Sequence, residues 1–123
     1  KIRKNLVFVV HSNHPKELNW ETQRAFNCLK NAGAWLLNQS VLLKGINDSA
    51  ETQTELAITL FNQGVLPYYL HLPDQVEGTS HFFVDTKKAK KIYKAMQSQL
   101  PGYLLPTLVK EIPGKTSKTI ITA

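Results

Sequence analysis

The 123-residue sequence predicts an α/β fold in which helices cover a parallel sheet. Short apolar runs rich in β-branched residues alternate with segments of helical periodicity along the chain. The first of these runs shows no polar alternation, which is typical of a strand that is covered on both faces. Gly33 and Gly64 mark near-equal repeats of about the length of one βα unit. We therefore predict three βα units followed by a final strand.

Three βα units and a fourth strand cannot close an eight-stranded barrel. The sequence fits either a small open α/β domain or the later part of a (β/α) barrel. No low-complexity segment or flexible linker divides residues 1–123, so we expect a single domain. An apolar run begins almost directly after Lys1, which suggests a piece of a longer protein.

The first unit starts with the apolar run Leu6–Val10, which ends in the polar segment His11–Pro15. A helix is expected from about Asn19 to Asn31, with Asn19 as its N-cap and Gly33 as its stop. Cys28 is the only cysteine, which excludes an internal disulfide and any site that needs several cysteines of this segment. The residues expected on the buried side of this helix are Ala25, Phe26, Cys28, Leu29 and Ala32.

In the second unit, Ala34–Leu43 contains a strand that we expect to be broken at Asn38-Gln39-Ser40. The next helix is expected over Ala50–Asn62, because Asp48 and Glu51 have the spacing of a capping box. Gly64 ends it. The residues expected to face inward are Leu56, Ala57, Leu60 and Phe61.

The third unit starts with the strand Val65–Leu72. Asp85 is the expected N-cap of a helix over about Thr86–Gln99, and a fourth strand is expected over Leu104–Val109. The buried side of the helix is assigned to Ala89, Ile92, Tyr93 and Met96.

The formal net charge is +6, and five of the positive charges lie in one short segment. These are Lys87, Lys88, Lys90, Lys91 and Lys94, which we place on the exposed face of the third helix. A phosphate or nucleic-acid surface is the alternative, but no aromatic or glycine pattern supports nucleic-acid binding. No segment has the length and apolarity of a membrane span or a signal peptide, so we expect a cytoplasmic protein.

Polar residues follow each predicted strand, and the carboxyl ends of parallel strands meet at one edge of a sheet. We assign His11, Asn13 and Gln39 to cofactor binding at this edge, with polar turn residues as the alternative for the histidine loop. Gln39 and Asn38, inside an apolar run, need hydrogen-bond partners in the protein or in a ligand. No residue spacing convincingly supplies a zinc site.

Lys118 lies in a small polar loop after the fourth apolar run, where an amine is well placed to form a Schiff base with an aldehyde cofactor. Lys115 in the same loop is the other candidate. Asp74 and Glu111 lie at neighbouring strand ends, where two carboxylates can hold one ammonium group of a diamine-type substrate. A turn or cap is the alternative for Asp74, and a surface charge is the alternative for Glu111.

Five segments, taken in order, resemble the carboxyl-terminal half of the lysine 2,3-aminomutases, which are radical S-adenosylmethionine enzymes that also use pyridoxal phosphate. The segments are His11-Ser12-Asn13-His14-Pro15, Asn38 to Asp48, Pro67-Tyr68-Tyr69, Asp74 to Phe82, and Gly102 to Thr107. The resemblance extends over almost the whole chain, without large gaps.

The resemblance implies a partial (β/α) barrel whose rim holds both cofactors. It implies that Lys118 attaches pyridoxal phosphate, and that Asp74 and Glu111 bind the side-chain ammonium of the substrate L-lysine. The cysteine motif that holds the [4Fe-4S] cluster in this family is absent here. The cluster and S-adenosylmethionine are therefore expected in a full-length parent, and this chain alone is expected to be inactive.

In Ser49 and in the short tail after Lys118, the sequence resembles the family's subgroup that makes β-lysine for the modification of elongation factor P. A free-standing α/β module that binds a phosphorylated ligand without catalysis is the alternative function. In isolation, the flanks of the sheet are expected to expose apolar edges and to favour a homo-oligomer.

Overall fold

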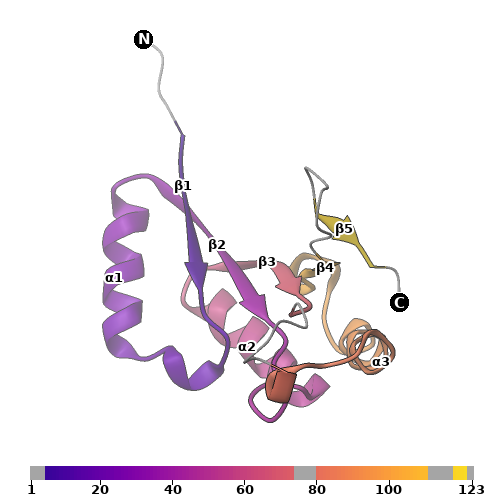
Figure 1. Ribbon diagram of the computed structural model, residues 1–123. Coiled ribbons are helices and arrows are strands. Elements are labelled where there is room, and N and C mark those ends of the chain that lie inside the picture. Colours follow the sequence, from indigo (N-terminus) through magenta and orange to yellow (C-terminus); the bar gives the residue numbers. More distant parts are fainter. Residues whose placement is uncertain (1–4, 74–79, 111–117, 122–123) are drawn as a thin grey trace.

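The computed structural model describes residues 5–73, 80–110 and 118–121, which form one five-stranded sheet and three helices (Figure 1). The strands lie side by side in chain order from β1 to β5. The elements are β1 (Leu6–His11), α1 (Trp20–Asn31), β2 (Ala34–Val41), α2 (Ala50–Asn62), β3 (Leu66–His71), α3 (Thr86–Gln97), β4 (Thr107–Lys110) and β5 (Thr119–Ile120).

The strands β1 to β4 are parallel, which confirms the predicted α/β class. A fifth strand, β5, was not predicted, and it pairs antiparallel with β4, so the sheet is mostly parallel. Residues 111–118 alone separate these two strands. A connection of this length is shorter than the dozen or so residues that a parallel crossover needs, so the chain returns in the opposite direction.

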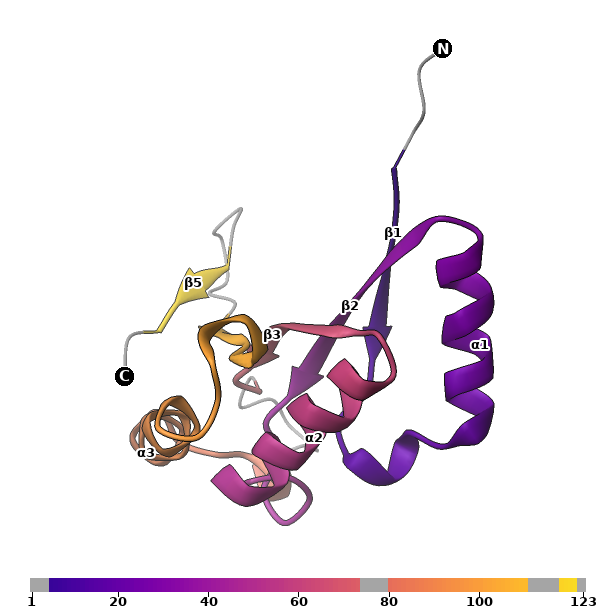
Figure 2. The same ribbon diagram turned by 180° about the vertical axis from the view of Figure 1, so that it is seen from behind.

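All three helices pack against the same face of the sheet. Side chains of β2 alternate, and Ala34, Leu36, Asn38 and Ser40 are the buried ones. Leu36 packs with α1 and α2, whereas Leu70 of β3, the register partner of Ser40, packs with α3. Figure 2 shows the molecule from behind, with α2 lying between α1 and α3. The opposite face of the sheet carries no helix among the described residues.

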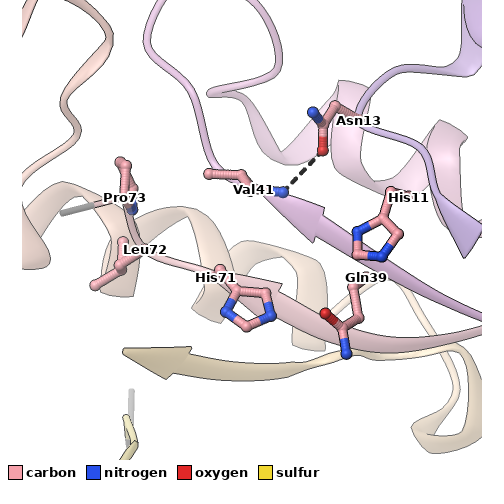
Figure 3. A pocket seen from close by; sticks show the side chains of 7 residues that line it. All are labelled: His11, Asn13, Gln39, Val41, His71, Leu72 and Pro73. Carbon is pink, nitrogen blue, oxygen red and sulfur yellow. Dashed lines mark hydrogen bonds between the residues drawn. The ribbon is translucent and has the colours of Figure 1, made fainter. Parts of the chain in front are cut away.

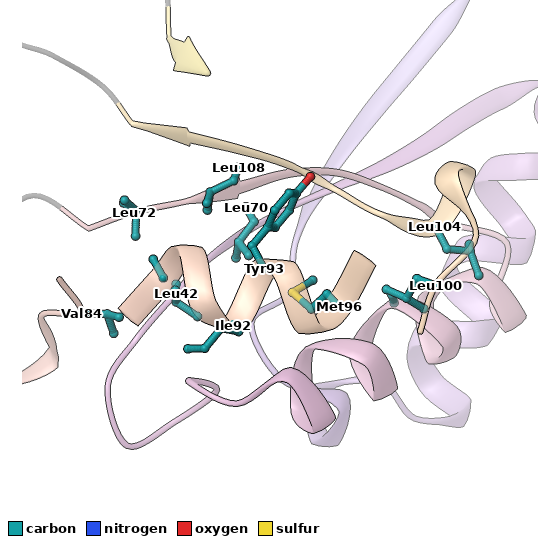
Figure 4. Packing of buried hydrophobic residues seen from close by; sticks show 12 residues of the cluster. Leu42, Leu70, Leu72, Val84, Ile92, Tyr93, Met96, Leu100, Leu104 and Leu108 are labelled. Carbon is teal, nitrogen blue, oxygen red and sulfur yellow. The ribbon is translucent and has the colours of Figure 1, made fainter. Parts of the chain in front are cut away.

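The larger apolar cluster lies between α3 and the strands β3 and β4 (Figure 4). Leu70 and Met96 are fully buried at its centre, and Leu108 is 1% exposed. The Tyr93 hydroxyl donates a hydrogen bond to the Pro106 carbonyl, and burial raises the pKa of this phenol. The inward assignments made for the third helix are therefore confirmed.

Four inward assignments in the first two helices were wrong, because Ala25, Cys28, Ala32 and Phe61 are exposed. Cys28 is exposed, because α1 packs on the sheet through Phe26 and Leu29, and Cys28 projects away from Phe26 on the helix. Phe61 is 44% exposed, because α2 turns Leu56, Ala57 and Leu60 toward the sheet instead.

The predictions for α2, β2 and the last parallel strand need correction. Ser49 caps α2 by accepting a hydrogen bond from the Thr52 N–H, so Asp48 is not the cap. The strand β2 is continuous through Asn38-Gln39-Ser40, and only its register with β3 shifts there. The last parallel strand starts at Thr107, because Gly102–Leu104 forms a 3-10 turn. The predicted caps Asn19 and Asp85 are confirmed.

Asp48 instead forms an ion pair with Lys88 of α3, with 2.7 Å between Oδ2 and Nζ. The hydrogen bond from Lys88 is the largest cause that holds the pKa of the Asp48 carboxyl below its usual range. Because the folded pKa lies below the unfolded one, the pair stabilises the protein above about pH 4. This stabilisation is lost as the pH falls through the folded pKa.

We expect Lys88→Ala to lower the free energy of unfolding by about 0.2–1 kcal/mol at pH 7, since the pair is partly exposed. The difference from the wild type shrinks below pH 4. Urea unfolding at pH 7 and pH 3 checks this expectation. Lys90→Ala is the control, since Lys90 is exposed on the same helix and has no ion pair within the described residues. An equal loss in both variants would contradict the role of the pair.

The strand β1 is the edge of the sheet, and its apolar side chains are exposed on both faces. Leu6, Val7, Phe8 and Val9 are between 39% and 54% exposed. On β2, Trp35 is 64% exposed on the face opposite the helices. These are the apolar edges expected from the sequence. No helix of the described residues has the length and apolar character that a membrane crossing requires.

Candidate functional site

A hollow of about 290 Å³ lies where the first three strands end (Figure 3). Its walls are formed by His11, Asn13, Gln39, Val41, His71, Leu72 and Pro73. The strands β1, β2 and β3 all run toward this edge, as parallel strands in one sheet must. The hollow therefore occupies the predicted edge, and it brings His11, Asn13 and Gln39 together.

Strand register explains why side chains from three strands meet in the hollow. His11 pairs with Gln39, and Gln39 pairs with Tyr69, so one row of side chains crosses β1, β2 and β3. Val41 and His71 form the next row on the same face, because side chains two residues apart on a strand point the same way. This is the face that the helices leave open.

Asn38 and Gln39 point to opposite sides of β2 and differ in what they bind. Asn38 is 2% exposed, and its side-chain oxygen accepts from the Ser12 N–H at 2.9 Å. Its Nδ2 donates to the Ser12 carbonyl at 3.1 Å. The Gln39 amide faces the hollow and makes no hydrogen bond within the described residues, so its polar atoms are available to a ligand.

Asn13 and Asn47 connect the segment after β1 to the end of β2. The Val41 N–H donates to Asn13 Oδ1 at 2.9 Å (Figure 3). Asn47 Nδ2 donates to the Asn13 carbonyl at 2.7 Å and to the Val41 carbonyl at 2.9 Å. Asn47 Oδ1 accepts from the Leu43 N–H at 2.8 Å. These bonds fix the wall of the hollow.

Asn47 is 1% exposed and was not assigned a role from the sequence. A buried amide with three backbone partners sets the path of two loops, so it belongs to the framework of the site. The only sequence signal was its position between Gly45 and the helix cap Ser49. That position is equally typical of an exposed turn.

Lys118 reaches the open face of the sheet from the position just before β5. Its Nζ lies 5.3 Å from the centre of the Tyr69 ring, within the range of a cation–π contact. Tyr69 contacts the His71 ring edge-on at 5.8 Å between centroids. Since His71 lines the hollow, the Lys118 amine lies on the same face of the sheet as His71 and Gln39.

The positive charge of Lys118 also acts on the neighbouring phenol. The hydrogen bond with Tyr69 is the largest cause that raises the pKa of Tyr68, and the Lys118 charge opposes it by favouring the ionised form. The two tyrosine rings lie 4.0 Å apart. Lys118 therefore lies over Tyr69, whose ring is tilted by 35° from the neighbouring Tyr68 ring.

The remaining candidate residues lie outside the described residues, and two further histidines lie outside the hollow. Asp74, Glu111 and Lys115 are outside them, so their proposed roles stay predictions. His14 accepts from the Lys16 N–H through Nδ1 and caps a 3-10 turn, while the His81 ring packs against Phe82. Within residues 5–73, 80–110 and 118–121, no three His, Cys, Asp or Glu side chains gather as metal ligands would.

The fold and the site define an α/β protein with a polar pocket at the carboxyl ends of its parallel strands and a lysine on the same face. Comparison with known proteins narrows this class. The chain is 48% identical to L-lysine 2,3-aminomutase of Haemophilus influenzae over 96% of its own length, and 47% identical to that of Buchnera aphidicola over 97%. The identity to L-lysine 2,3-aminomutase of Escherichia coli is 43% over 93% of the chain.

By sequence the chain belongs to the lysine 2,3-aminomutase family, as its motifs predicted. It spans about a third of the length of these curated relatives, with 35%, 35% and 33% covered. No protein-family model matches the chain.

Proposed function

We propose that this chain forms the pyridoxal phosphate and substrate-binding part of an enzyme that converts L-lysine to β-lysine. The observation that carries the proposal is the position of Lys118, whose amine lies on the open face that also bears Gln39 and His71. The identity to L-lysine 2,3-aminomutases over nearly the whole chain supports the same conclusion.

The described residues suit a phosphorylated aldehyde cofactor in three respects. Lys118 supplies an amine, which is the group that such a cofactor needs for attachment. Tyr69 supplies an aromatic surface beside that amine. His11 and Gln39 supply polar atoms to a hollow of about 290 Å³, close to the lower end of ordinary ligand sites.

When bound, pyridoxal phosphate would supply electron delocalisation at the reacting carbon. The chain's own residues would position the reactants. Lys118 would hold the cofactor, and Gln39 and His11 would donate or accept hydrogen bonds in the hollow. Asn13 and Asn47 would keep the loops in place. Asp74 and Glu111 are proposed to bind the side-chain ammonium of lysine, which two carboxylates can do together.

The remaining parts of the proposal concern the full-length protein. We propose that its other residues hold S-adenosylmethionine and a [4Fe-4S] cluster, since this chain has one cysteine. We also propose that the chain is the carboxyl-terminal part of a partial (β/α) barrel. The helices on one face of a parallel sheet support this, because an open doubly wound sheet carries helices on both faces. Ser49 supports the proposal that the full-length protein belongs to the subgroup that makes β-lysine for elongation factor P.

Borohydride reduction of the full-length protein with pyridoxal phosphate is expected to leave a stable pyridoxyl group on Lys118. Peptide mass spectrometry locates the label, and Lys118→Ala is expected to abolish it because no amine remains at that position. Lys110→Ala is the matched control, since Lys110 lies on the adjacent strand β4 and is partly buried as Lys118 is.

The same protein, reconstituted with its cluster and S-adenosylmethionine, is expected to form β-lysine from L-lysine. The proposal is refuted if borohydride reduction leaves no label on Lys118 of the wild type. It is also refuted if the protein holds all its cofactors but forms no β-lysine. A free-standing phosphate-binding module would bind pyridoxal phosphate without either result.

A further inference from the structure

We propose that the face of the Tyr69 ring is the resting position of the Lys118 ammonium whenever this lysine is not attached to the cofactor. The inference rests on the proposed function and assigns Tyr69 as a positioning residue for the reactive amine. It is carried by the arrangement of Lys118, Tyr69 and His71 on the open face of the sheet, with the Tyr68 ring next to that of Tyr69.

The first step of the argument is the contact itself. Lys118 Nζ lies 5.3 Å from the centre of the Tyr69 ring, and an ammonium within about 6 Å of a ring centroid is attracted by the negative face of the ring. Lys118 is partly buried. An amine in a partly buried position gains more from such a contact than one that is surrounded by water.

The second step is that the Tyr69 ring is itself held in place. Tyr69 pairs with Gln39 of β2 and with Thr107 of β4, so its backbone lies in the interior of the sheet. Its ring contacts Tyr68 at 4.0 Å and His71 at 5.8 Å between centroids. An aromatic side chain on a central strand, in contact with two neighbouring rings, offers a fixed surface to a flexible lysine.

The third step concerns what the contact does. A lysine that holds a cofactor is attached at one stage of a reaction and free at another. A lysine side chain has four rotatable bonds, and a contact at its amine reduces the number of positions that it takes. The Tyr69 face helps to keep the detached amine on the side of the sheet that bears Gln39 and His71, so that the amine can reattach without a search through solvent. Lys118 directly precedes β5, whose pairing with β4 fixes the base of the lysine, and the ring holds its tip.

The position of the amine can be tested by NMR in the full-length protein without cofactor. Reductive methylation with ¹³C-formaldehyde labels each lysine amine, and Lys118→Arg identifies the Lys118 signal. We expect this signal upfield of those from the exposed lysines of α3, because protons above a ring face are shielded. Tyr69→Phe keeps the ring and is expected to keep the shift. Tyr69→Leu removes the ring and is expected to return the signal to the position of the exposed lysines.

A Lys118 signal among those of the exposed lysines in the wild type would overturn the inference, as would an upfield signal that survives in Tyr69→Leu. If Tyr69→Leu fails to fold, the wild type and Tyr69→Phe still decide it, because both must show the upfield signal. The borohydride label separates this inference from the proposed function. A labelled Lys118 without the upfield signal would refute the resting position alone, whereas an upfield signal without the label would refute the attachment of the cofactor.

Discussion

Asn47→Ala is expected to lower the free energy of unfolding by about 2–4 kcal/mol. The substitution removes one acceptor and two donors, and it leaves the Leu43 N–H and the carbonyls of Asn13 and Val41 without this partner. A buried polar group that loses its partner costs about 1–3 kcal/mol. Asn47 is 1% exposed, so water cannot readily replace the amide. The expected loss is smaller than the sum of three such costs, since relaxation lets some of the groups find new partners.

Urea unfolding followed by circular dichroism measures this loss. Asn62→Ala is the matched control, because Asn62 is exposed at the end of α2 and has no side-chain hydrogen bond among the described residues. The pyridoxyl label on Lys118 is also expected to decrease in Asn47→Ala, because the wall of the hollow moves when the bond to Asn13 is lost. An Asn47→Ala protein as stable as Asn62→Ala would show that the amide does not hold the loops.

The order of elements was predictable because local signals dictate it. Apolar runs and helical periodicity fixed the three βα units, and Asn19 and Asp85 marked helix starts through their capping chemistry. The edge where His11 and Gln39 meet was also predictable, because parallel strands always bring their carboxyl ends to one edge. These features depend on short stretches of sequence and on general rules of sheet topology.

Other features depend on which distant residues come into contact. The sequence of α1 offered both Cys28 and Phe26 as core residues, and only packing on β2 placed Phe26 inside. Asn38 and Gln39 looked alike, yet the register of β1 on β2 gives Asn38 a partner 26 positions away in the chain and leaves Gln39 in the hollow. In the sequence, Tyr69 looked like one more residue of an apolar strand. Its contact with Lys118 links β3 to the residue just before β5, across β4. Helical and strand periods carry no information on such pairings.

Leu70→Ala is expected to lower the free energy of unfolding by about 2–5 kcal/mol, the usual cost of a leucine removed from a packed core. Leu70 is fully buried on β3, between Ser40 of β2 and Leu108 of β4, and it packs against α3 (Figure 4). The shorter side chain leaves a cavity at the junction of three elements that cannot easily collapse, since the strands are fixed by their hydrogen bonds.

Ile58→Ala provides the control for Leu70→Ala, because Ile58 is 43% exposed on α2 and its removal leaves no cavity. Urea midpoints at constant slope measure both variants. A cost for Leu70→Ala no larger than that for Ile58→Ala would mean that α3 does not pack on this face. The helices and the hollow would then no longer lie on opposite faces of one sheet. The position of Lys118 over Tyr69, on the face away from Leu70, would lose its structural basis, because adjacent strand residues point to opposite faces.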